Sequence, residues 1–202
     1  MRRRQSVLIA VLAFASAPAF ADVSTNPQSV PKGTYKLEPN HTSVLFCIRH
    51  MGISDYCGRF NTIGGKIGFS GSQPAKSSAT IEIDMASIDT PSDKLDEKLR
   101  VEFLETAKFP KASFVAKSIK ITGKNQGEIT GALTLHGVTK PMTLTTTFNG
   151  GQVHPLTNAY VIGFSAMTTI KHADFAFPDV VWKPFIGDEI KLYIESEFIA
   201  EN

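Results

Sequence analysis

Apolar and polar residues alternate with a period of two along most of the chain from Thr34 onward. In residues 81–85, for example, the apolar side chains are Ile81, Ile83 and Met85, and the two residues between them are acidic. Successive side chains of a β-strand point to opposite faces of the sheet, so this pattern gives a strand one apolar face and one face in water. The alternation therefore predicts an all-β fold of half-buried antiparallel strands.

The number of such segments indicates a barrel. Residues 81–85 and 190–198 alternate most regularly, and a short lead strand is expected at Thr34 to Leu37. Six further segments have strand-like patterns: Val44 to His50, Gly58 to Ser70, Ala112 to Ile121, Glu128 to Leu135, Met142 to Phe148 and Tyr160 to Thr169. Eight antiparallel strands can close into a barrel whose interior holds its own side chains or one slender ligand. We therefore expect an extended, eight-stranded antiparallel barrel.

One segment interrupts the strand pattern. Thr90 is a residue type that caps helix N-termini, Pro91 suits the first helical position, and Asp93 stands three residues beyond the cap. An apolar residue then recurs every fourth position, at residues 95, 99 and 103, among mostly charged neighbours. These signals predict one short amphipathic helix whose apolar stripe closes one end of the barrel.

Composition restricts both the number of domains and the function. The chain has 202 residues, of which 42% are hydrophobic and 20% are charged, which is typical of one globular domain. Its formal net charge is +2, and it becomes −1 when the three arginines at positions 2–4 are removed. A near-neutral domain without a basic run lacks the charge that holds phosphate backbones, which argues against nucleic-acid binding.

The N-terminus has the features of a secretory signal peptide. The three arginines precede an apolar stretch from Val7 to Ala17, and Ala19-Phe20-Ala21 fits an A-x-A cleavage site. The apolar stretch is shorter than the roughly 20 residues that a membrane-spanning helix needs. An uncleaved membrane anchor and a twin-arginine signal are less favoured alternatives.

Export defines the expected domain organisation. We expect residues 1–21 to be a signal peptide cleaved after Ala21, residues 22–33 to be a mobile lead-in, and residues 34–202 to form the barrel domain. The expected location is the periplasm.

The two cysteines, Cys47 and Cys57, then lie in an oxidising compartment. A hairpin centred on Gly52 would place them directly opposite each other, at a distance that allows a disulfide. The alternative is a pair of buried reduced thiols that pack as small apolar side chains.

Several motifs resemble the YceI-like family of exported lipid-binding proteins. They are His41-Thr42-Ser43-Val44-Leu45-Phe46 with His50 and Gly58-Arg59-Phe60, then Ile88-Asp89-Thr90, Leu99-Arg100 with Phe103-Leu104, Lys108-Phe109-Pro110, the stretch from Gly131 to Pro141, and Phe175. The resemblance covers about Thr34 to Phe198 and rests on the number, order and spacing of the motifs. It implies a lipocalin-like barrel with a helix near one end, enclosing a long apolar tunnel for polyisoprenoid chains, including isoprenoid quinones and isoprenyl pyrophosphates.

The alternation indicates which side chains would line such a tunnel. The expected lining residues are Val44, Phe46, Ile48, Leu133, Leu135, Leu144, Phe148 and Phe164. By pattern alone, the favoured interpretation is that these side chains fill a small barrel. The resemblance and the 14 phenylalanines favour a tunnel, because bulky, stiff side chains can line a bore as well as fill one.

Four residues are candidates to bind the polar head group of a lipid. His41 and His50 fall at the ends of a predicted strand in matched motifs and could donate to a quinone carbonyl or pair with a pyrophosphate. The guanidinium groups of Arg49 and Arg100 could grip phosphate oxygens. The alternatives are histidines that tie a strand end to a loop and arginines in surface ion pairs. The family often has histidine before Leu99-Arg100, where this chain has Lys98, which puts a head-group role there in doubt.

The leading functional hypothesis is therefore a non-enzymatic periplasmic protein that carries or sequesters a long-chain isoprenoid lipid. A role in stress response is part of this hypothesis. No catalytic motif, resident cofactor or metal-ligand spacing is evident, so none is expected. The alternative is an accessory protein that delivers quinone to a membrane cytochrome b-type protein. A homodimer is compatible with the sequence, which holds no evidence for or against one.

Overall fold

The computed structural model describes residues 23–181 and 183–201, so the predicted signal peptide lies outside the described residues. The strands are β1 (Gly33–His50), β2 (Ser54–Phe60), β3 (Ile63–Phe69), β4 (Ser78–Asp84), β5 (Ile88–Asp89), β6 (Lys111–Ile121), β7 (Gln126–Leu135), β8 (Val138–Val153), β9 (Tyr160–Lys171) and β10 (Ile186–Ala200). The helical segments are η1 (Pro27–Ser29), η2 (Pro74–Lys76), η3 (Met85–Ser87), α1 (Asp93–Lys98), η4 (Leu99–Phe103), η5 (His172–Asp174) and η6 (Lys183–Phe185).

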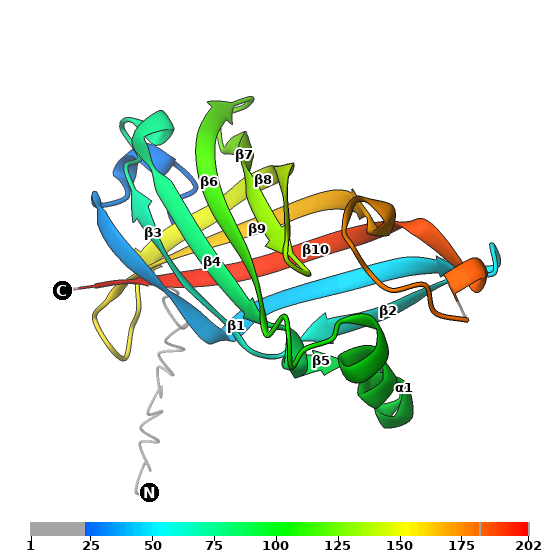
Figure 1. Cartoon of the computed structure of the whole chain (residues 1–202). Helices are drawn as coiled ribbons and strands as arrows, with labels where there is room; N and C mark the ends of the chain where they lie inside the picture. The colour runs from blue at the N-terminus through cyan, green and yellow to red at the C-terminus, as the bar shows by residue number, and fades with distance from the viewer. Residues whose placement is uncertain (1–22, 182, 202) are drawn as a thin grey trace, which may run out of the picture.

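Eight of the strands close into an antiparallel barrel (Figure 1). The hydrogen-bonded order is β1, β3, β4, β6, β7, β8, β9, β10, and β10 then pairs back with β1. That last pairing runs from Tyr35 opposite Ala200 to His50 opposite Ile186. The predicted all-β, eight-stranded barrel with one short helix is thus confirmed. The remaining two strands, β2 and β5, form a ribbon attached to the far half of β1.

Strand β1 has 18 residues because it serves two neighbours on the same edge. Its first part, residues 33–36, pairs with β3, and its last part, residues 44–50, pairs with β2. The pairing with β10 shifts register between Glu38 and Ser43, where the strand passes from one neighbour to the other. The two strands predicted at 34–37 and 44–50 are therefore one bent strand.

The single strand predicted at Gly58 to Ser70 is wrong, because β2 ends at Phe60 and β3 begins at Ile63. The two intervening residues turn the chain. The backbone N–H of Asn61 donates to the carbonyl oxygen of Ser87 at 3.0 Å, and the N–H of Thr62 donates to the hydroxyl of Ser87 at 3.0 Å. The backbone N–H groups of these two residues thus donate to Ser87 of η3 and not to a neighbouring strand, which ends the strand pairing there.

Cys47 and Cys57 form the predicted disulfide. They lie directly opposite each other in the β1–β2 hairpin, with Cα atoms 4.1 Å apart and sulfurs 2.00 Å apart. The hairpin turns at Met51 and Gly52, whose φ angles are 52° and 73°. Glycine tolerates this left-handed backbone without steric cost.

The helix begins later than the sequence predicts. Ser92 caps it, because its hydroxyl accepts a hydrogen bond from the N–H of Leu95 at 3.4 Å. Thr90 is instead buried, and both its N–H and its hydroxyl donate to the carboxylate of Asp96, at 2.9 and 2.6 Å. The hydrogen-bonding groups of Thr90 are thus used by the side chain of Asp96, and Thr90 does not cap the helix.

The helix lies beside β5 (Figure 1), and its predicted apolar stripe packs against the core only through its later residues. It continues into the wider π-helical turn η4, whose Phe103 is buried and stacks on Phe177 with ring centroids 4.4 Å apart. Leu99 packs against the same part of the core. No helix in the described ranges is long and apolar enough to cross a membrane.

The described part of the predicted lead-in is packed on the barrel rather than free of it. Ser24 pairs with Gly151 through two backbone hydrogen bonds of 3.0 and 2.9 Å. Val30 is buried in the core. This loop-like segment therefore packs beside β8, because the backbone of Ser24 pairs with that of Gly151.

We predict that replacing both cysteines with alanine destabilises the fold by about 2–3 kcal/mol, because the bridge restricts a loop of sequence separation 10 in the unfolded chain. Denaturant unfolding with and without a reducing agent measures this effect. Reductant should shift the midpoint of the wild type and leave that of the double variant unchanged. An unchanged wild-type midpoint would contradict the prediction.

Candidate functional site

The buried core is divided into two clusters. A helix-side cluster contains Phe103, Phe114, Leu133, Leu144 and Phe175 with their neighbours. A terminus-side cluster contains Tyr35, Phe69, Phe148, Ile162 and Phe198 with theirs. A cavity of about 640 Å³ is lined by residues of both clusters. The barrel is therefore not packed solid. The volume of the cavity falls within the range of about 300–1,000 Å³ that is usual for ligand sites.

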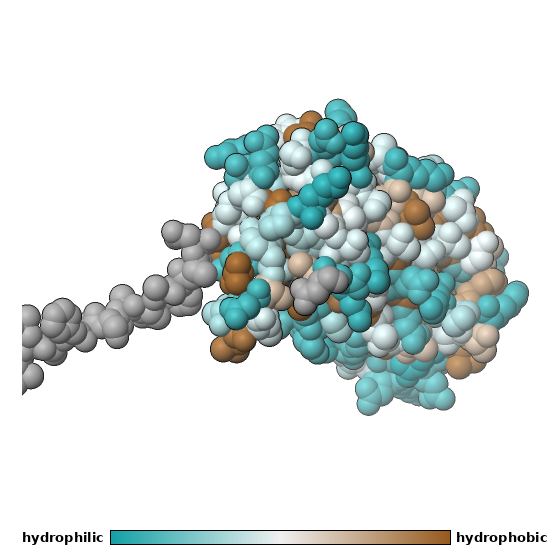
Figure 2. Space-filling model, turned by 90° about the vertical axis from the view of Figure 1, so that its left-hand side faces the viewer, coloured by the Kyte–Doolittle hydropathy of each residue, from teal (hydrophilic) through white to brown (hydrophobic). Residues whose placement is uncertain are grey.

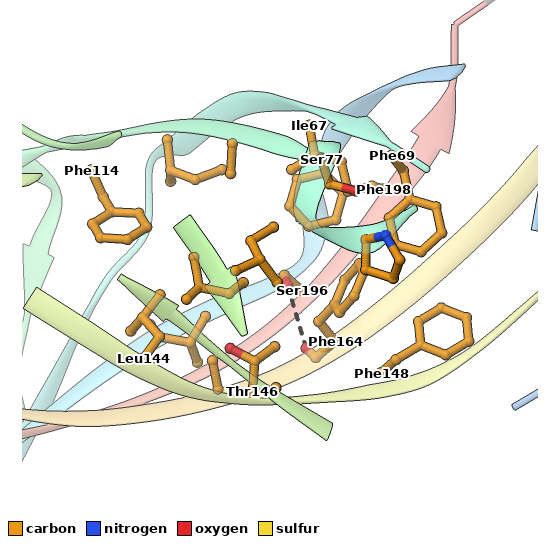
Figure 3. Close-up of a pocket in the computed structure, with 18 of the residues that line it drawn as sticks. Ile67, Phe69, Ser77, Phe114, Leu144, Thr146, Phe148, Phe164, Ser196 and Phe198 are labelled. Carbon is orange, nitrogen blue, oxygen red and sulfur yellow. Dashed lines mark hydrogen bonds between the residues drawn. The ribbon is translucent and has the colours of Figure 1, made fainter. Parts of the chain in front are cut away.

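Four phenylalanines form one part of the cavity wall (Figure 3). The ring centroids of Phe69 and Phe148 are 6.0 Å apart, and Phe164 lies 5.4 Å from Phe148 and 6.1 Å from Phe198. Rings at these separations stabilise each other beyond their burial, so the wall can keep its shape around an open space. Phe114 and Leu144 lie in another part of the same wall (Figure 3).

Polar residues from turns stand at the cavity mouth. They lie in or next to η1, at the start of β4 and in the loop before it, and in the β6–β7 turn up to the first residue of β7, and they are Asn26, Gln28, Ser72, Ser77, Ser78, Lys124, Asn125 and Gln126. Lys124 is the one charged side chain among the described residues that line the cavity. A polar rim above an apolar interior suits a ligand with a long apolar part and a small polar part.

The outer surface differs from this interior. On the face shown in Figure 2, most exposed side chains are hydrophilic, and apolar ones appear as separate patches among them.

Five of the predicted tunnel residues line the cavity: Val44, Leu133, Leu144, Phe148 and Phe164. The other three, Phe46, Ile48 and Leu135, are not part of its lining. Phe46 packs against Phe60 of β2 with ring centroids 5.6 Å apart, and Leu135 is buried in the helix-side cluster. Ile48 lies opposite Tyr56 in the β1–β2 ribbon. The alternation continues past the cavity, where the same strand face packs against the ribbon or the helix.

None of the four predicted head-group residues lines the cavity. His41 is exposed, and its Nδ1 lies 2.7 Å from Oε2 of Glu38. Burial alone would raise the pKa of the Glu38 carboxyl, but hydrogen bonds from Asn40 and His41 outweigh it and hold that pKa below its usual range. His41 thus belongs to a polar cluster at the bend of β1.

The other three candidates also have neighbours outside the cavity. Nε of Arg49 lies 3.2 Å from Oδ1 of Asp55 across the β1–β2 hairpin, and His50 is exposed at the end of β1. Arg100 donates from Nη1 to the carbonyl oxygen of Ile88 at 3.2 Å. Arg49 and His50 are consecutive at the end of β1, whereas His41 lies at the bend of β1 and Arg100 lies in η4, so the four candidates come from three separate places in the fold.

The prediction missed Thr146, a polar residue in the cavity wall. It occupies an inward position of β8 between Leu144 and Phe148, where the alternation calls for an apolar residue. That interruption is the sequence signal that could have identified it. The mouth residues were missed because turns carry no periodic pattern.

The matched family model is decisive for classification. A model of the YceI-like domain matches residues 35–198, which run from near the start of β1 to near the end of β10. The chain belongs to the YceI-like family. A UPF0312 protein of Pseudomonas savastanoi pv. phaseolicola is 37% identical over 139 residues, covering 68% of this chain and 72% of the relative. One from Ectopseudomonas mendocina is 38% identical over 136 residues, covering 67% and 71%.

Solved structures share this YceI-like fold. BcnA from Burkholderia cenocepacia superposes with a TM-score of 0.72 at 21% identity, covering 80% of this chain and 98% of BcnA. The YceI protein of Campylobacter jejuni has a TM-score of 0.66 at 27% identity, covering 76% and 90%. A domain from Saccharophagus degradans, described as polyisoprenoid-binding and implicated in plant cell wall breakdown, has a TM-score of 0.64 at 16% identity, covering 85% and 100%.

We predict that an uncharged apolar fluorescent probe, N-phenyl-1-naphthylamine, binds in the cavity of this YceI-like protein. Ala166→Phe should weaken binding about tenfold or more, because Ala166 lines the cavity and the added ring needs part of its space. Fluorescence titration measures the affinity. Met167→Phe is the matched control, since Met167 is the next residue and is exposed. Equal affinities of the two variants would contradict the prediction.

Proposed function

We propose that this protein binds a long-chain isoprenoid lipid inside the barrel. The observation that carries the proposal is the cavity of about 640 Å³, whose lining is mostly apolar and has its polar turns at the mouth. An isoprenoid chain has almost no hydrogen-bonding groups, so its affinity must come from apolar burial. That burial contributes about 25 cal/mol for each Å² removed from water.

Two comparisons support the choice of ligand. The chain belongs to the YceI-like family, and a domain of the same fold from Saccharophagus degradans is described as polyisoprenoid-binding. Carriage or sequestration of such a lipid requires no catalytic group. We therefore infer a binding protein rather than an enzyme.

We further propose that the protein acts in the periplasm. The support is the signal-peptide pattern of residues 1–21 together with the Cys47–Cys57 disulfide, since disulfides persist in oxidising compartments. A lipid carrier there would shield an apolar chain from water as it crosses the aqueous space. Roles in stress response are compatible with the same binding activity.

The decisive experiment is to purify the protein from the periplasm without detergent and identify bound lipid by native mass spectrometry followed by organic extraction. We expect one isoprenoid lipid for each chain. A fatty acid in its place would show that the cavity selects for chain shape rather than for isoprene. Protein that is empty and takes up no added prenyl lipid would refute the proposal.

We predict that His41→Ala and Arg49→Ala leave the affinity for a prenyl lipid unchanged, because both side chains are exposed and neither lines the cavity. Ala166→Phe should lower the affinity for the same lipid as strongly as it lowers the affinity for the fluorescent probe. Competition against that probe measures all three variants. A loss of affinity in either surface variant would restore a head-group role to that residue.

A further inference from the structure

One hydroxyl group in the cavity wall has no hydrogen-bond partner within the protein. It belongs to Thr146, which is 7% exposed and lines the cavity. Figure 3 places it between Leu144 and the phenylalanines Phe148 and Phe164. Among the described residues, the other such buried side chain is His136, but it has an ion-pair contact, with Nε2 2.9 Å from Oε2 of Glu105, and it does not line the cavity.

The surroundings of Thr146 leave room for a ligand atom. Its partners on the neighbouring strands are Gly127 of β7 and Ala166 of β9. Both line the cavity, and both have small side groups. This row of three small residues lies between the larger side chains of Leu144 and Phe148, so the Thr146 side chain borders the cavity although it is hidden from solvent. The hydroxyl oxygen itself is covered, so a ligand oxygen reaches it when the side chain rotates about its Cα–Cβ bond toward the cavity.

A water molecule is a poor partner for this hydroxyl. A buried water needs about two to four polar partners, and the residues next to Thr146 along and across the strands are Leu144, Phe148, Gly127 and Ala166. Ser196, which also lines the cavity, has a partner of its own, because its hydroxyl donates to the carbonyl oxygen of Phe164 at 3.3 Å. A buried hydroxyl without a partner is destabilising, which favours a ligand that supplies one.

The charge of the wall restricts what that ligand atom can be. Lys124 is the one charged side chain among the described lining residues, and it is exposed in the β6–β7 turn. An ionised phosphate or carboxylate next to Thr146 would be buried among apolar groups with no counter-charge, which is strongly unfavourable. A hydroxyl or carbonyl oxygen can exchange one hydrogen bond with Thr146 at no such cost.

We propose that Thr146 hydrogen-bonds one uncharged oxygen atom of the bound lipid, a hydroxyl or a carbonyl, inside the barrel. This inference rests on the proposed lipid-binding function and names the chemical class of its ligand. Thr146 sets that preference, and the apolar walls on both sides hold the hydrocarbon part.

The test compares two ligands that differ by one oxygen: geranylgeraniol and the hydrocarbon with the same carbon chain. Both are titrated by competition against N-phenyl-1-naphthylamine. Thr146→Val, which removes the hydroxyl but keeps the shape, should lower the affinity for the alcohol about two- to tenfold and leave that for the hydrocarbon unchanged. Thr146→Ser should retain most of the preference for the alcohol. Thr145→Val is the matched control, because Thr145 is the preceding residue and is exposed.

The outcomes separate this inference from the function on which it rests. If the wild type binds both ligands and Thr146→Val changes neither affinity, or lowers both equally, the inference is overturned while lipid binding stands. If the wild type binds neither ligand, both proposals fail. A selective loss of the alcohol in Thr146→Val, absent in Thr145→Val, supports the inference.

Discussion

The pairing of β1 with β10 is the interaction on which the rest of the structure depends. It joins the first and last strands of the sheet and so removes the two edges that an open sheet would expose. Once the edges are joined, the inward faces of eight strands surround one interior that is shielded from water. The cavity, its phenylalanine wall and the position of Thr146 all require this closure.

A closed barrel that keeps an open interior must obtain its stability elsewhere. Here part of each cluster packs away from the cavity, Phe103 and Phe175 in the helix-side cluster and Tyr35 and Ile162 in the terminus-side cluster. The Cys47–Cys57 bridge adds a covalent constraint to the ribbon beyond the barrel. The cavity that both clusters line can then accept an apolar chain, and the burial of that chain adds to the apolar core.

Several features of the fold follow from local sequence, and others do not. The sequence predicted three of these features because each depends on neighbouring residues. They are the strand alternation, the amphipathic helix and the hairpin that places the two cysteines opposite each other. The continuity of β1 and the break at Asn61 were not, because they depend on contacts with distant strands and with Ser87. The helix start was misplaced for a similar reason: Thr90 has the right chemistry for a cap, but the buried Asp96 uses its hydroxyl and N–H.

The candidate site shows the same division. The sequence by itself determined which side chains face inward, since a period of two assigns every residue of a strand to one face. Only the tertiary structure decided what each inward residue meets. Val44 reaches the cavity and Phe46 reaches the ribbon, although both lie on the same face of β1. The physical reason is that strand pairing is long-range: the register between β1, β2 and β10 sets where the cavity ends, and no local pattern encodes that register.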